Sequence, residues 1–118
     1  MHGHFYLYGD QGFRESIKDI IYNFYFKKSV CIVQTSYALE EFAAFVTNYN
    51  EKCTHHQPYS VVFVCDPRND ESDKVTNYYE MLKEIGMAFE KTPSFETIAQ
   101  DKLEELLTKN GFIETACF

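Results

Sequence analysis

Several features are scarce in this sequence of 118 residues. It contains no tryptophan, five glycines and three prolines, too few for a collagen-like or low-complexity chain. No uninterrupted apolar run approaches the roughly 20 residues that a membrane-spanning helix needs. No basic residue precedes Arg14, so we expect no signal or transit peptide. With 45% hydrophobic residues, the composition favours one small soluble globular domain over residues 1–118.

Basic residues are also scarce. Eleven lysines and arginines face 18 acidic residues, for a net charge of −7, and Lys27-Lys28 is the only adjacent basic pair. Proteins that bind nucleic acid usually carry a basic stripe, because neutralising phosphates supplies much of their affinity. We therefore expect no direct nucleic-acid binding. The acidic balance favours solubility, and it is also compatible with an acidic surface offered to a basic partner.

The four cysteines follow no CxxC or other regular spacing. Cys31 and Cys65 lie inside apolar runs, where thiols usually act as small buried hydrophobic groups. This usage indicates a reducing, cytoplasmic compartment. The sequence from Cys53 to His56 is the one metal-like cluster, but adjacent histidines do not face one metal ion well. We interpret it as a polar loop.

Strand-like and helix-like patterns alternate along the chain. Short apolar runs predict strands at 4–8, 30–33 and 59–65, with shorter candidates at 87–89 and 112–118. Apolar residues at helical spacing predict helices around 13–24, 36–46, 72–85 and 93–110. Such alternation is typical of parallel strands with helices on both faces. We predict an α/β three-layer sandwich with a mostly parallel central sheet of about five strands.

Acidic residues follow two of the predicted strands. Asp10 ends the first strand and Asp66 ends the third, with Glu15 and Asp70 a few residues further along. Ligands of open parallel sheets bind outside the carboxyl ends of the strands. If the first and third strands are adjacent, as is common, these four carboxylates form one metal site. Carboxylates bind Mg²⁺, which would serve phosphoryl transfer or phosphodiester cleavage.

The same acids have a structural interpretation. Asp is favoured at strand-to-helix turns because its side chain caps helices. Asp10, Asp66 and Asp70 are all placed for this role, and both interpretations remain open.

Three short segments resemble the Toprim domain in the form found in phage-defence nucleases. They are DQGFRE, with Asp10 and Glu15; YSVVFVCD, ending at Asp66; and TPSFE at residues 92–96. The resemblance covers roughly residues 4 to 100 and implies a parallel α/β fold with an acidic metal site. However, Asp10 stands where the family has Glu, and Arg68 stands where its second Asp belongs. The resemblance therefore implies a member with a damaged active site.

A second resemblance is to the receiver domain of response regulators. Asp10, Asp66 and Thr92 match its acidic, phosphoacceptor and hydroxyl positions, but no lysine lies in the last predicted strand.

The run from Ile20 to Phe26, IIYNFYF, is unusually aromatic. As a helix it would be apolar all round, which is typical of a fully buried helix or of an interface. Tyr22, Tyr25 and Phe26 then form a partner surface, such as that of a homodimer, since tyrosine suits interfaces. In the alternative, the helix ends near Tyr22 and the residues after it pack beneath the sheet. Both remain open.

Two functions follow from these patterns. The favoured one is a small non-catalytic partner-binding or regulatory domain whose partner is another protein or a second copy. The alternative is a Mg²⁺-dependent enzyme that acts on phosphates or phosphodiesters.

Overall fold

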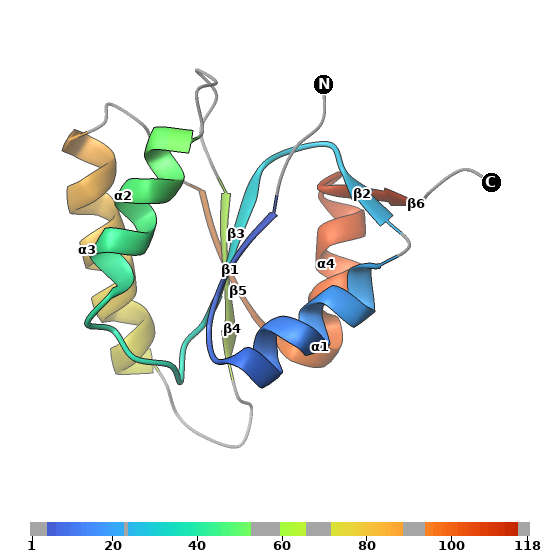
Figure 1. Ribbon diagram of the computed structural model, residues 1–118, viewed down its shortest axis with the longest axis horizontal. Helices are drawn as coiled ribbons and strands as arrows, with labels where there is room; N and C mark the ends of the chain where they lie inside the picture. Colours follow the sequence, from blue (N-terminus) through green and yellow to red (C-terminus); the bar gives the residue numbers. More distant parts are fainter. Residues whose placement is uncertain (1–4, 23, 53–59, 66–71, 89–93, 116–118) are drawn as a thin grey trace.

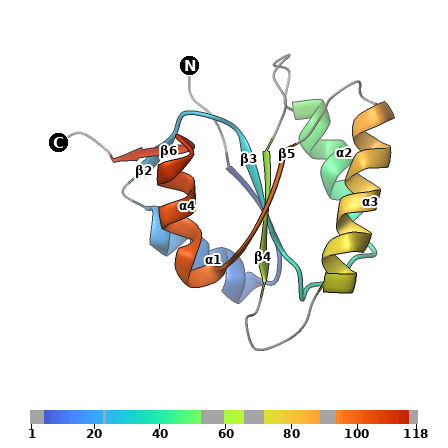
Figure 2. The ribbon, with the colours of Figure 1, turned by 180° about the vertical axis from the view of Figure 1, so that it is seen from behind.

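A parallel sheet lies between two pairs of helices in the computed structural model, which describes residues 5–22, 24–52, 60–65, 72–88 and 94–115 (Figures 1 and 2). The strands run in the order β1-β3-β4-β5. Their bounds are Phe5–Tyr8 for β1, Val30–Gln34 for β3, Ser60–Cys65 for β4 and Ser94–Ala99 for β5. The predicted three-layer α/β architecture is confirmed, with four strands in the main sheet rather than about five.

Each face of the sheet is covered by two helices (Figure 1). Helices α1 (Gln11–Ile21) and α4 (Leu103–Lys109), the latter after a 3₁₀ turn, lie on one face. Helices α2 (Phe42–Lys52) and α3 (Ser72–Ala88) lie on the other. None of the helices in the described part of the chain combines the length and apolar character that crossing a bilayer requires.

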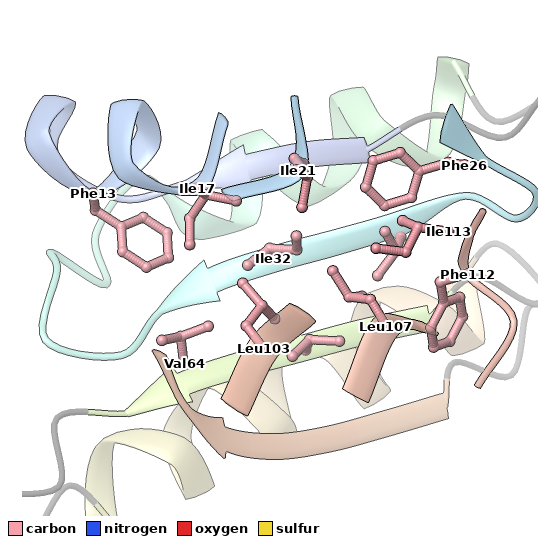
Figure 3. Close-up of a cluster of buried hydrophobic side chains, with 12 residues drawn as sticks. Phe13, Ile17, Ile21, Phe26, Ile32, Val64, Leu103, Leu107, Phe112 and Ile113 are labelled. Carbon is pink, nitrogen blue, oxygen red and sulfur yellow. The ribbon is translucent and has the colours of Figure 1, made fainter. Parts of the chain in front are cut away.

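Alternation along the strands divides the core between the two faces. Val62 and Val64 of β4 belong to the cluster beneath α1 and α4, whereas Val61 and Phe63 belong to the cluster beneath α2 and α3. Figure 3 shows the first cluster, in which side chains of α1 and α4 meet those of the sheet. All four of these β4 residues are buried. Strand β4, which the sequence predicts at 59–65, is therefore covered on both faces.

A second, two-stranded sheet stands apart from the first. Strand β2 (Phe24–Phe26) pairs antiparallel with β6 (Ile113–Thr115). The helix predicted through Phe24 therefore ends at Ile21, and the last predicted strand does not join the main sheet. Aromatic residues favour pleated, half-buried surfaces, and the alternation of Phe24, Tyr25 and Phe26 suits a strand with one outward side chain.

The last third of the chain also differs from the prediction. Strand β5 occupies residues within the helix predicted around 93–110, and α3 continues through Gly86 to Ala88, where the sequence predicts a strand. Residues Ser94 to Ala99 pair with β4. The stabilisation from this strand pairing therefore outweighs the local preference of these residues for a helix. The predicted helix end at Gly111 is confirmed by its positive φ of 72°, the conformation that favours glycine.

The first crossover between strands differs in hand from the next two. All three steps move in the same direction across the sheet, yet α1 covers the face opposite α2 and α3 (Figures 1 and 2). Simple crossovers are almost always of one hand, but here β2 is inserted between α1 and β3. The chain consequently leaves β1 towards one face and β3 towards the other.

Candidate functional site

After the carboxyl end of β1 the chain continues to α1 on one face of the sheet, and after the carboxyl end of the adjacent β3 it continues to α2 on the other face. This is where open α/β sheets place their ligands. The backbone N–H of Asp10 donates to Gln34 Oε1 at 2.9 Å, which ties the turn after β1 to the end of β3. Thr35 is buried, and its backbone N–H and its hydroxyl both donate to the carbonyl of Val64. The edge of the sheet is therefore fixed by hydrogen bonds across three strands.

The predicted metal residues are only partly placed. Asp10 is the N-cap of α1, and its Oδ1 accepts from the backbone N–H of Phe13 at 2.8 Å. Glu15 is exposed and accepts from the Gln11 side chain at 3.0 Å. Asp66 and Asp70 lie outside the described residues, as does Thr92. Within the described ranges, no three His, Cys, Asp or Glu side chains gather to hold a metal ion.

The expected adjacency of the first and third predicted strands is wrong. Strand β3 lies between β1 and β4 and pairs with both. Two strand spacings, roughly 10 Å, therefore separate the backbone of β1 from that of β4. The adjacency assumed a strand order that reverses, whereas this order follows the sequence without reversal.

The aromatic run divides between surface and core. Tyr22 is the C-cap of α1 and is 83% exposed, and Tyr25 points outward from β2 and is 41% exposed. Phe26 is 4% exposed and packs on Phe5 with ring centroids 4.8 Å apart, which removes it from the surface expected for all three residues. Of the two alternatives, the helix end near Tyr22 is the observed one.

The cysteines differ in burial. Cys31 is buried, as predicted, and Cys65 is half-buried; neither forms a disulfide within the described part of the chain. Cys53 and Cys117 lie outside the described residues, as does His56.

A hollow of about 400 Å³, not foreseen from the sequence, lies beside the end of β3. Its walls are the segment 36–40 and the side chains of Lys74, Asn77 and Tyr78 from the first turns of α3. The sequence pattern placed a helix start at 36–40, whereas α2 begins only at Phe42. Residues 36–40 therefore line the hollow, which the local sequence pattern did not predict.

Two tyrosines hold this wall in place. The Tyr78 hydroxyl donates to the carbonyl oxygens of Tyr37, at 2.9 Å, and Ala38, at 3.2 Å, and the Tyr8 hydroxyl donates to that of Ala38 at 2.5 Å. Burial raises the pKa of Tyr8, and the negative charges of Glu41 and its neighbours raise the pKa further. The Tyr8 hydroxyl therefore keeps its proton at neutral pH and remains a donor.

Comparisons of the chain with protein-family models, with curated proteins and with solved structures give no match.

Proposed function

We propose that this chain is a non-catalytic protein-binding domain that forms a homodimer through Tyr22 and Tyr25, the tyrosine surface. The observation that carries the proposal is the 83% exposure of Tyr22, the largest among the exposed large hydrophobic side chains in the described part of the chain. It stands at the end of a helix whose other face is buried through Phe13, Ile17 and Ile21. Tyrosine is enriched at protein interfaces, because it packs a large ring and also forms a hydrogen bond.

The charges around the tyrosine surface favour a second copy as the partner. Lys18 lies one helical turn before Tyr22, with Asp19 beside it, and Lys27 follows Tyr25 by two residues. Charges of both signs therefore lie close to the two tyrosines in the sequence. A two-fold interface brings the same patch of both copies together, so it must be self-complementary. Lysines of one copy facing acids of the other would meet that requirement.

A Toprim-like, phage-defence ancestry belongs to the same proposal. The parallel α/β sheet supports it, whereas the separation of β1 from β4 weighs against a shared acidic site. A degenerate scaffold without catalysis accommodates both observations. The magnesium-dependent alternative has less support, since the Asp10 carboxylate is engaged as a helix cap.

Light scattering coupled to size exclusion tests the dimer. We expect the wild-type chain to shift from monomer to dimer as its concentration rises from micromolar to millimolar. Replacing both residues, Tyr22→Ser with Tyr25→Ser, should leave a folded monomer at every concentration, with an unchanged circular dichroism spectrum.

The matched control is Tyr79→Ser, which removes an exposed tyrosine from α3 on the opposite side of the sheet. This variant should dimerise as the wild type does. A wild-type chain that stays monomeric throughout, or a dimer that persists in the double variant, would refute the proposal. Repeating the runs with added Mg²⁺ tests whether the ion changes the assembly.

A further inference from the structure

The hollow beside the end of β3 has the size and position of a small-molecule site. Its volume of about 400 Å³ falls within the range of roughly 300–1,000 Å³ that is usual for ligand pockets. Five of its lining residues belong to the segment 36–40, which follows the carboxyl end of β3 at Gln34. Ligands of open α/β sheets bind outside the carboxyl ends of the strands.

Hydrogen bonds hold the wall of the hollow in place. Tyr78 is 1% exposed, and its hydroxyl holds the carbonyls of Tyr37 and Ala38, the second of which also accepts from Tyr8. A ligand therefore does not have to order this segment, which lowers the cost of binding.

Two side chains of opposite charge lie in the lining. Glu40 comes from the segment before α2 and Lys74 from the first turn of α3. Within the described part of the chain, neither side chain forms an ion pair or hydrogen bond, with the other or with any third group. Ser36 and Asn77 add a hydroxyl and an amide to the same lining. Such an arrangement complements a molecule that carries both a positive and a negative charge.

The rest of the lining is apolar. Tyr37 is 39% exposed and Leu39 is half-buried. An aromatic ring prefers to pack against another ring in an offset or edge-on arrangement, so the Tyr37 ring offers a place for an aromatic side chain.

We propose that this hollow binds a zwitterionic molecule of the amino-acid class with an apolar or aromatic side chain. The ligand's ammonium group faces Glu40, its carboxylate faces Lys74, and its side chain packs on Tyr37 and Leu39. The site is independent of the proposed dimer, because it lies on the α2–α3 side of the sheet and the tyrosine surface lies on the α1 side (Figure 1).

Three matched probes test the charge requirement by NMR titration of the full-length ¹⁵N-labelled chain. They are L-phenylalanine, L-phenylalaninamide, which lacks the carboxylate, and N-acetyl-L-phenylalanine, which lacks the ammonium. We expect saturable shift changes in residues 36–40 and the first turns of α3 with L-phenylalanine. Each other probe should bind at least about fivefold more weakly, corresponding to roughly 1 kcal/mol for one exposed charge pair.

Two variants assign the charges. Glu40→Gln should abolish the preference over N-acetyl-L-phenylalanine and keep the preference over the amide, while Lys74→Gln should do the reverse. Lys83→Gln, on the same helix but outside the hollow, is the control and should bind as the wild type does.

Three outcomes would overturn the proposal. They are the absence of saturable shifts with L-phenylalanine, equal affinity for all three probes, and shifts centred on Tyr22 and Tyr25 instead of the hollow. Since the wild-type dimer is measured separately, failure here leaves the proposed function standing, and failure of the dimer leaves this site standing.

Discussion

Tyr8 and Tyr78 donate their hydroxyl hydrogens to the same acceptor, the carbonyl oxygen of Ala38. One tyrosine ends β1 and the other lies in α3, and their rings meet edge-on with centroids 6.4 Å apart. The pair thus joins the first strand, the turn after β3 and the third helix at one point. This point also supports the wall of the hollow, so the stability of the fold and the shape of the hollow depend on the same hydrogen bonds.

Removing the Tyr78 hydroxyl should cost measurable stability. Tyr78→Phe keeps the buried ring but leaves the Tyr37 carbonyl without this donor, so we expect a loss of about 0.5–1.5 kcal/mol in the free energy of unfolding. Urea denaturation measures it. Tyr22→Phe alters a hydroxyl on a side chain that is 83% exposed and should stay within about 0.5 kcal/mol of wild type. Equal effects of the two variants would contradict the assigned role of Tyr78.

Alkaline pH should weaken the fold through Tyr8. Burial and the nearby acidic charges raise its pKa in the folded chain, whereas in the unfolded chain tyrosine ionises near pH 10. The unfolded state therefore loses this proton first. The contribution of Tyr8 to stability is complete below about pH 10 and declines as the pH rises towards the folded-state pKa.

The comparison with Tyr8→Phe isolates this effect. Denaturation at a series of pH values should show the stability difference between wild type and variant shrinking above about pH 10. A difference that stays constant across the series would show that Tyr8 ionises alike in both states.

Truncating two residues of the aromatic run, Phe26 and Tyr22, should have very different effects on stability. Phe26 is buried against Phe5, so Phe26→Ala should cost about 3–5 kcal/mol through lost burial and the cavity left behind. Tyr22→Ala should change the stability of the monomer by less than about 0.5 kcal/mol. Thermal or chemical unfolding at a concentration where the chain is monomeric provides the measurement. A neutral Phe26→Ala would place that ring outside the core.

The sequence predicted the elements whose pattern has a single interpretation. The apolar run at 59–65 lacks alternation, and only a central strand buries both faces. The segment from Phe95 to Ala99 fits both a helical stripe and a strand, and pairing with β4 decides for the strand. The end of α1 is similar, because Phe24 completes a helical stripe, whereas Phe24 and Phe26 also alternate as in a strand. Such choices depend on which edge is open in the folded chain.

The candidate sites were predictable only where they are local. Asp10 caps the helix that immediately follows it, and its spacing to Phe13 is sufficient to foresee this. The order of the strands in the sheet is set by contacts between distant parts of the chain. The expected adjacency of β1 and β4 is therefore wrong, because β3 lies between them. The hollow could not be predicted either, because it is formed by residues that are distant in the sequence. Residues 36–40 come close to Lys74 and Asn77 only through the packing of α2 on α3.

Gly9, in the turn after β1, and Gly12, in the first turn of α1, should respond with opposite signs to an added methyl group. A Cβ at Gly9 would lie 2.5 Å from Phe13 Cδ2 and 2.8 Å from Gln34 Oε1. Gly9→Ala must therefore displace the Phe13 ring and the Gln34 side chain that anchors Asp10, at a cost of about 1–3 kcal/mol. At Gly12 the nearest such contact is Asp10 Oδ1 at 3.5 Å, so Gly12→Ala should stabilise the chain by about 0.4–1 kcal/mol through reduced freedom of the unfolded state. Urea denaturation of both variants measures the sign of each change in the free energy of unfolding. A Gly9→Ala variant as stable as the wild type would show that the fold does not require the close approach between the end of β1 and Gln34.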